Sequence, residues 1–488
     1  MKITEYLERE YGVDRGIKGN WQANVNEWKS WYQGKVKHFH NYTIYNGKSR
    51  IKKKKLSLQM AKKSCEDWAD TLFNERVRLE LGSDEATKKL FDILQKLNFW
   101  EFMNASVEQS GAVGTGAVVV SVTNIEIDED GVITNSDMEP RLDYVSIDNI
   151  YPISWENGIV TECAFATRKL VKGKFYVWLS IHHYDDNGNM VIENKLFKSD
   201  KFLNVEELDY VAAEEIGADI IPEYATGSDI PWFALIKPAG TNNIKPELPF
   251  GMPYFSQAID VLKRIDNTFD ALQNEVDLGR KRIFIRSELT DVDKVTGEDV
   301  TVFDPNDMSV YLLPKGFNSE DFLQTESSEL RVDELTKDLE NSLALFGDKV
   351  GFGVQYYQLD PAGQVRELGI MTQNSKMIRR KKKHEIVLES AVYDIVRAVL
   401  YASNQPYDNL KITFDDDIID DENERKKTAL TEISSGVLAK HEYREMFMGE
   451  DANKAIKAIQ DIENESMTSL EIEWGDVNNA DNRGTRTD

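Results

Sequence analysis

The chain has 488 residues, 41% of them hydrophobic and 10% aromatic, which is enough apolar material for two or three folded domains and excludes a disordered protein. Its formal net charge is −26, from 59 Lys and Arg against 85 Asp and Glu, which favours simple solubility and argues against tight wrapping of DNA. Two cysteines exclude a disulfide framework, and we expect neither a signal peptide nor a membrane span, because no apolar run approaches the roughly 20 residues required.

The first 55 residues predict two helices, Thr4 to Tyr11 and Trp21 to Tyr32, followed by a basic run from Lys48 to Lys55. Trp28 and Trp31 make the second helix unusually aromatic, and its tryptophans pack either in their own domain or against a neighbouring chain. A solvated loop is the commoner meaning of the basic run, although it could meet DNA or an acidic neighbouring subunit.

The next segment predicts four elements and a break. The expected elements are a helix over 56–72, a strand over 76–81, and helices over 84–97 and 99–109. We expect the last helix to be broken by a cluster of glycines, Gly111, Gly114 and Gly116. The cluster matches neither a phosphate-binding loop nor a dinucleotide fingerprint, so a nucleotide site is rejected.

From about 117 to 237 the pattern is that of a β-rich region, with strands predicted over 144–150, 159–168, 175–183 and 190–197. Asn157-Gly158 and Asn187-Gly188 are hairpin turn signals. His182 and His183 are adjacent in a predicted strand, so their side chains face opposite ways and form a poor metal pair.

Ser256 to Leu278 predicts a long helix of roughly 35 Å, ended by Gly279. Its apolar residues repeat at steps of four and three, which is the pattern of a seam that packs against other helices. We refer to these residues as the seam: Ala258, Leu262, Ile265, Phe269, Leu272 and Val276. A basic cap over 280–286 and a small piece over 282–325 follow, with strands predicted at 283–285, 300–303 and 309–313.

The stretch from Glu329 to Tyr401 predicts a helix, a glycine-broken loop and a longer helix. We expect the first helix to stop at Gly347 and the loop to cover 348–363, with glycines that allow it to change shape. The second helix is expected to start near Gln364 or Leu368 and carries a basic shoulder over 379–384.

The C-terminal part predicts a strand over 409–414, an acidic run over 415–422, helices over 424–432, 441–448 and 451–467, and a disordered polar tail from Glu473. The acidic run lacks the loop pattern and glycine of a calcium site, so a solvated connector is favoured over a metal site.

Two stretches carry a resemblance to a known family. Leu330-Arg331-Val332-Asp333-Glu334-Leu335 through Gly351-Phe352-Gly353, with Lys383-His384-Glu385-Ile386-Val387-Leu388-Glu389, resembles portal proteins of tailed double-stranded DNA bacteriophages, of the class found in long-tailed phages of Gram-positive hosts. The resemblance implies an α+β fold with a mixed wing, a two-helix stem, a small α/β clip inserted between the stem helices, a tunnel loop with a long kinked helix, and a helical crown. The implied divisions are wing 1–250, stem helix 251–281, clip 282–325, stem helix 326–347, tunnel loop 348–363, wing helix and strand 364–416, crown 417–470 and tail 471–488.

The implied function is that of a head–tail connector. Copies would form a ring, dodecameric in the family, at one capsid vertex of the virion after assembly in the host cytoplasm. Double-stranded DNA would pass through it during packaging and ejection. The implied partners are the major capsid protein, the scaffold, the terminase large subunit and the adaptor of the neck. Twelve copies carry 12 × −26 = −312 formal charges, so an acidic channel is expected, along which DNA slides without sticking. The implied DNA-facing residues are Lys349, Gly351, Phe352, Gly353, Gln355, Tyr356 and Tyr357. Packing of Phe352, Tyr356 and Tyr357 against loops or helices of neighbouring subunits is an equally weighted alternative.

No catalytic residue, cofactor, metal or membrane contact is expected. Two rival functions remain: a metal-dependent nucleic-acid enzyme that uses the acids of 415–422, and a capsid or scaffold protein. A two-metal site needs carboxylates that converge from different elements, which one consecutive run does not provide. The order helix, small insertion, helix disfavours a capsid or scaffold protein.

Overall fold

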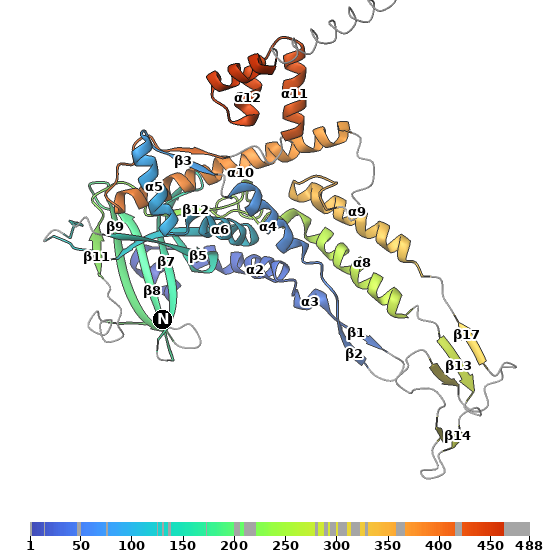
Figure 1. Cartoon of the computed structure of the whole chain (residues 1–488). Helices are drawn as coiled ribbons and strands as arrows, with labels where there is room; N and C mark the ends of the chain where they lie inside the picture. Colours follow the sequence, from blue (N-terminus) through green and yellow to red (C-terminus); the bar gives the residue numbers. More distant parts are fainter. Residues whose placement is uncertain are drawn as a thin grey trace, which may run out of the picture. The chain divides into compact units, whose positions relative to one another are not determined.

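The fold was obtained as a computed structural model (Figure 1). It describes residues 2–462 except 14, 46–49, 75–76, 124, 129–130, 135–137, 172, 200–204, 209–220, 279–281, 287–290, 293–298, 301–309, 314–322, 327–329, 358–366 and 415–421. The chain divides into two compact units, Met1–Phe414 and Asp415–Asp488. Both α-helices and mainly antiparallel β-strands build the first unit, as expected for an α+β portal fold.

The N-terminal half of the first unit supplies the helices α1 (Ile3–Tyr11), α2 (Arg15–Tyr32), α3 (Lys37–His40), α4 (Met60–Leu72), α5 (Asp84–Lys96) and α6 (Phe99–Val113). The expected helix over 56–72 begins four residues late, because Gln59 has a φ of 53°, which is not helical, and residues 56–58 are in neither a helix nor a strand. The expected break at Gly111 is also wrong, since α6 runs through it and ends at Val113, before Gly114 with a φ of 86°. Trp21, Trp28 and Trp31 of α2 are buried in the core of their own unit.

The β-rich region forms two antiparallel sheets. One sheet has the order β12 (Phe233–Ile236), β4 (Gly116–Thr123), β5 (Glu139–Ser146). The other has the order β10 (Val205–Glu207), β9 (Met190–Ser199), β8 (Lys174–Tyr184), β7 (Ile159–Val171), β6 (Ile150–Glu156), with β11 (Glu223–Ala225) paired to β9. The predicted strand over 144–150 is in fact split between β5 and β6 by a 3₁₀ turn at Ile147–Asn149.

Both predicted hairpin turns are present. Asn157 and Gly158 have φ values of 51° and 80° between β6 and β7, which is the left-handed backbone that an Asn-Gly hairpin turn requires. Gly188 has a φ of 84° between β8 and β9. His182 is buried and His183 half-buried, so the two side chains differ in environment as their adjacent places in β8 predict.

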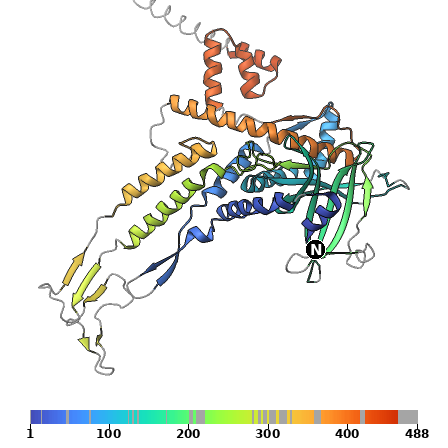
Figure 2. The same ribbon diagram turned by 180° about the vertical axis from the view of Figure 1, so that it is seen from behind.

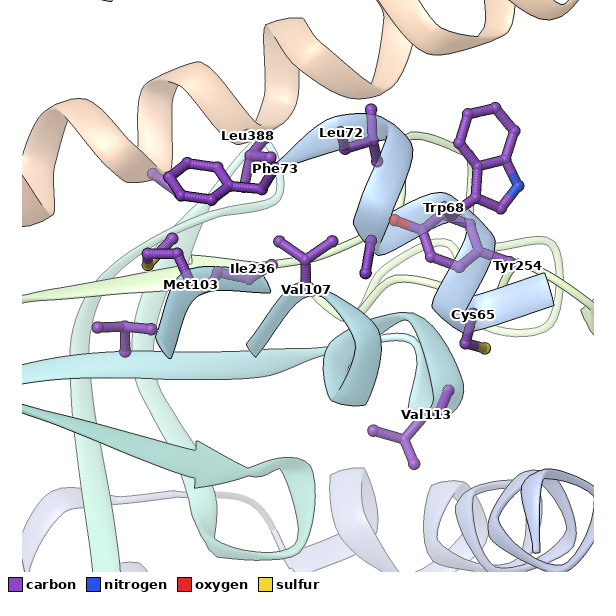
Figure 3. Packing of buried hydrophobic residues seen from close by; sticks show 14 of the residues in the cluster. Cys65, Trp68, Leu72, Phe73, Met103, Val107, Val113, Ile236, Tyr254 and Leu388 are labelled. Carbon is purple, nitrogen blue, oxygen red and sulfur yellow. The ribbon is translucent and has the colours of Figure 1, made fainter. Parts of the chain in front are cut away.

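The main core collects helices from distant parts of the sequence (Figure 3). The close-up shows Cys65, Trp68 and Leu72 of α4 facing Met103 and Val107 of α6, with Tyr254 and Leu388 approaching from other segments. Leu388 belongs to α10 (Glu367–Ala402), and after α10 the strand β18 (Lys411–Thr413) pairs with β3 (Arg78–Glu80). The core therefore closes only when the N-terminal helices meet α10.

Three further groups complete the described elements. A hairpin consists of β1 (Asn41–Tyr45) and β2 (Arg50–Lys54). Between α8 (Ile259–Leu278) and α9 (Val332–Val350), β16 (Val310–Leu313), β13 (Arg282–Arg286) and β17 (Leu323–Glu326) form one sheet, and β14 (Asp291–Val292) pairs with β15 (Asp299–Val300). Strand β17 was not predicted from the sequence. The predicted strand residues 301–303 and 309 lie outside the described residues, as does Gly279, where the long helix was predicted to end.

The second unit contains α11 (Glu422–Ser434), α12 (Lys440–Met448) and a helix over 452–462. Gly436, with a φ of 75°, lies between α11 and α12, which correspond to the predicted helices over 424–432 and 441–448. Residues 415–421 of the acidic run, the expected helix beyond 462 and the expected disordered tail lie outside the described residues.

Candidate functional site: the α8–α9 pair, its hairpin and the loop after α9

The helices α8 and α9 lie side by side and antiparallel (Figures 1 and 2). Arg331, at the start of α9, donates from Nη2 to Oε2 of Glu275 at 2.9 Å, near the end of α8. Further along the pair, Asp338 accepts from Arg264 and from Oγ1 of Thr268, the latter at 2.8 Å. These hydrogen bonds hold the pKa of both Glu275 and Asp338 below the ordinary value. The polar contacts therefore fix the register of the two helices.

The seam on α8 is covered at one end and open at the other. Ala258, Leu262 and Ile265 are 1%, 3% and 0% exposed and belong to the main core. Phe269 is only partly buried, and Val276 is 46% exposed. The chain thus uses half of the predicted seam for its own core and leaves the half from Phe269 to Val276 incompletely covered.

A second face of α8 is polar and carries the hairpin. Asp266, which is buried, accepts from Nε2 of His40 at 2.9 Å and from the amide of Leu58 at 3.0 Å. The amide of Val36 donates to Nδ1 of His40 at 2.9 Å, so the proton of the neutral ring lies on Nε2, which donates to Asp266. One helical turn later, Asp270 accepts from the hydroxyl of Tyr42 at 3.2 Å and from the amide of Leu56 at 3.1 Å.

Two lysines of the basic run continue this contact. Lys55 donates to Oδ1 of Asn267 at 2.7 Å, and Lys53 reaches Oδ1 of Asn274 at 3.4 Å. Residues 50–54 of the basic run are therefore a strand, with Lys53 and Lys55 against α8, and not the loop that its composition favoured, while residues 48 and 49 lie outside the described residues. Sequence reasoning missed this contact, although a signal was present: Asp266, Asp270 and Asn274 recur at steps of four, which places them on one face of a helix.

The loop after α9 begins later than predicted. Gly347 lies inside α9, and the helix ends at Val350, followed by Gly351 with a φ of 100°. The amides of Gly351, Phe352 and Gly353 all donate to the carbonyl oxygen of Gly347 at 3.0 Å. Gly353 has a φ of 93° and is buried. The glycines thus shape a compact turn, while Gly363, the other expected hinge, lies outside the described residues.

The aromatic side chains of this loop occupy a pocket against α4. Phe352 is 4% exposed, and its ring centroid lies 4.4 Å from that of Trp68. Tyr357 is 9% exposed and donates to Oδ2 of Asp67 at 2.9 Å, and burial raises its pKa. Phe352, Gly353 and Tyr357, three of the expected DNA-facing residues, are buried in the single chain, and their contact with DNA stays a prediction.

Four of the expected DNA-facing residues keep accessible surface. Lys349, at the end of α9, and Tyr356 are exposed, whereas Gly351 and Gln355 are half-buried. The ring of Tyr356 stacks on that of the buried Phe352, with 4.4 Å between the ring centroids, and this contact fixes the orientation of the tyrosine. Lys349 and Gln355 therefore remain candidates for contact with a channel, and Tyr356 presents one edge to solvent.

His384 joins α10 to this pocket. Its Nδ1 accepts from the amide of Ala239 at 2.8 Å, and its ring lies 4.8 Å from that of Trp68. Burial, together with the nearby positive charges of Arg380 and Lys383, lowers the pKa of His384 to about 3. His182, in the β8 strand, is likewise buried, and burial lowers its pKa to about 3. Both rings are neutral in the folded chain at pH 7.

We predict that stability falls as pH drops below about 6.5, the ordinary pKa of histidine. Below that pH the histidines of the unfolded chain bind protons, whereas the buried rings of His384 and His182 stay neutral until about pH 3. Each ring therefore lowers the free energy of unfolding by about 2–3 kcal/mol at pH 4.5. Urea unfolding at pH 7.0, 5.5 and 4.5 measures the loss. His384→Gln should flatten the dependence, while His38→Gln, at an exposed position, should not. An unchanged slope in His384→Gln would contradict the assignment.

Protein atoms, and not a ligand, fill the glycine cluster. A Cβ at Gly111 would lie 2.2 Å from the ring of Tyr254, and one at Gly114 would lie 2.4 Å from the carbonyl oxygen of Gly251. The glycines therefore serve close packing, which agrees with the rejection of a nucleotide site. In the described part of the chain, no three His, Cys, Asp or Glu side chains gather as metal ligands. None of the described helices is long and apolar enough to cross a membrane.

Comparison with known proteins identifies the family. The model of the family "Phage portal protein, SPP1 Gp6-like" matches residues 18–469. No curated protein sequence matches the chain. Solved structures that match the chain include the neck of a native gene transfer agent particle, computed with C12 symmetry (TM-score 0.39, 10% identity, 79% of this chain and 88% of that chain). Another is the virion of a native gene transfer agent particle (TM-score 0.41, 11% identity, 79% of this chain and 88% of that chain). Because the family model spans nearly the whole chain, the chain belongs to the SPP1 Gp6-like family of phage portal proteins, the head–tail connectors of phage particles.

Proposed function

We propose that copies of this chain form a dodecameric ring at one capsid vertex and that double-stranded DNA passes through its centre during packaging and ejection. The terminase large subunit would dock during packaging, the adaptor of the neck afterwards, and the major capsid protein and scaffold would surround the ring. Assembly would take place in the host cytoplasm. The family match over residues 18–469 supports a head–tail connector, and these finer features extend it.

The observation that carries the proposal is the α8–α9 pair with its half-open seam. A lone pair of helices leaves the stretch from Phe269 to Val276 incompletely covered, whereas a ring of such pairs covers that stretch with a neighbouring copy. On this basis we assign the stem to α8 and α9, the clip to residues 282–325 between them, the wing to 1–250 and 364–416, and the crown to 417–470. No observation favours the nuclease or the capsid protein.

Negative-stain imaging of the purified protein tests this assembly. Rings with a central hole, seen along the axis as twelve repeats, are the expected result. We further propose that the chain has no catalytic activity, so the same preparation should hydrolyse neither ATP nor DNA in the presence of Mg²⁺. Monomers at micromolar concentration in near-physiological salt would contradict the ring.

Lys349 provides a test of the channel. As an exposed cation at the end of α9, it would make transient contacts with phosphate in an otherwise acidic channel. Lys349→Glu is expected to leave rings and procapsids intact but to lower the ratio of DNA-filled to empty heads several-fold. Lys88→Glu, an equal charge change at an exposed position of α5, is the matched control. A normal ratio in Lys349→Glu would show that this position does not meet DNA.

A further inference from the structure

The outward face of the β1–β2 hairpin is a row of cations. Successive residues of a strand point to opposite faces, so Lys53 and Lys55 turn toward α8 while Arg50, Lys52 and Lys54 turn away from it. Arg50, Lys52 and Lys54 are all exposed. Within the described residues, no carboxylate forms an ion pair with any of the three. Three cations in a row, in a chain of net charge −26, mark a surface that suits an acidic partner.

We propose that this basic face docks on the outer surface of α9 of a second copy of this chain, with Lys52 and Lys54 opposite Asp333 and Glu334 of that copy. The proposal rests on the ring of the proposed function and names the contact that closes it.

The hairpin and α9 lie on opposite sides of α8. Figures 1 and 2 show α9 on one side of α8 and the hairpin on the other. The hydrogen bonds agree, since Asp266 and Asp270 of α8 face the hairpin, whereas Arg264 and Thr268 face α9. At about 100° per residue these two sets lie on separate faces of α8. The hairpin and α9 are thus the two edges of one strip, and a head-to-tail ring brings unlike edges together.

The acids of α9 and the cations of the hairpin lie at similar positions along the axis of α8. On one side of α8, Glu275 contacts Arg331 and Thr268 contacts Asp338, so Asp333 and Glu334 lie between these two levels. On the other side, Asn274 contacts Lys53 and Asn267 contacts Lys55, so Lys54 lies in the same stretch of α8 and Lys52 just beyond it. The proposal includes a ring axis parallel to α8. Rotation about such an axis does not change the position of any residue along it. The rotation therefore presents Asp333 and Glu334 of the next copy to Lys52 and Lys54.

The two edges carry opposite charges. Asp333 and Glu334 are exposed, and neither forms an ion pair within the part of the chain that the structure describes. Two copies of net charge −26 repel one another at close range, so cations on one edge and acids on the other reduce the cost of closing the ring. Duplex DNA is the weaker candidate for the hairpin, because the carboxylates of Asp266 and Asp270 lie directly behind the cations and reduce their attraction for phosphate.

Charge reversal on each edge tests the contact. Lys52→Glu/Lys54→Glu and Asp333→Lys/Glu334→Lys should each weaken ring formation about tenfold or more in 50 mM salt, measured as the fraction of rings by sedimentation velocity and negative stain. The four substitutions combined in one chain should restore rings, as should mixing the two double variants, because either arrangement again places cation opposite acid. Lys88→Glu/Lys96→Glu on α5 makes the same net charge change at exposed positions and is the matched control.

The outcomes separate the inference from the proposed function. Rescue by the combined variant supports the contact even if a single double variant is less stable, since a merely unfolded chain is not restored by further charge reversal. Normal rings in both double variants would overturn the inference alone. Normal rings together with lost binding of a 30-base-pair duplex, followed by fluorescence anisotropy, would assign the hairpin to DNA instead. Wild-type protein without rings would overturn the proposed function and, with it, this contact.

Discussion

Replacing Gly347 with alanine is expected to destabilise the folded chain by about 2–3 kcal/mol and to release the loop of residues 351–357 from its pocket. A Cβ at this position would lie 2.2 Å from the carbonyl oxygen of Gly353. That oxygen is backbone, and it cannot retreat without disturbing the hydrogen bonds from the amides of Phe352 and Gly353 to Gly347. Phe352, whose ring lies against Trp68, would leave the core with the turn.

Urea unfolding gives the loss of stability, and hydrogen exchange of amides 351–357 reports release of the loop. Gly240→Ala is the matched control, because a Cβ there meets nothing within 4 Å and the backbone is not left-handed. Exchange in Gly347→Ala that is as slow as in the wild type would mean that the turn accommodates a methyl group, contrary to the geometry.

Val276→Asp is expected to abolish rings while leaving the single chain folded. Val276 is 46% exposed in the chain by itself, so an aspartate there is hydrated and costs little. In a ring whose neighbours cover the open half of the seam, the same carboxylate is buried without a partner, which is strongly unfavourable. Size-exclusion chromatography and circular dichroism measure assembly and folding separately.

Gln273→Asp is the matched control, since it introduces the same charge at an exposed position of α8 three residues earlier. Rings should survive in this variant. If Val276→Asp also assembled at the wild-type concentration, the open half of the seam would not be a subunit contact.

Local patterns in the sequence predicted most of the helices and the long strands, because burial repeats every 3.6 or 2 residues within one element. These patterns gave wrong predictions where the role of a residue depends on contacts with residues far away in the sequence. Gly111 and Gly347 interrupt no helix; each leaves space for a group from elsewhere, the ring of Tyr254 and the carbonyl of Gly353. A glycine that ends a helix and one that admits a neighbour are identical in a one-dimensional pattern.

The candidate site shows the same limit. The spacing of the seam predicted the helix α8 but could not show that Ile265 is covered by its own chain and Val276 is not. The aromatic residues of the loop after α9 were predicted to face DNA. The ring of Phe352, however, packs against Trp68, which is far away in the sequence. Contacts of this kind leave no local signal.

The position of Trp68 also has a consequence for synthesis of the chain. Its indole packs against Tyr254, Phe352 and His384, so the partners are made long after it. His384 follows Trp68 by 384 − 68 = 316 residues, which is roughly 15 to 60 s of translation at about 5–20 residues per second. Until Tyr254 is made the tryptophan has none of its three aromatic partners, and until His384 is made it lacks at least one of them, so chaperones have time to bind the nascent helix. The first unit, Met1–Phe414, therefore completes its core only after α10 has been made.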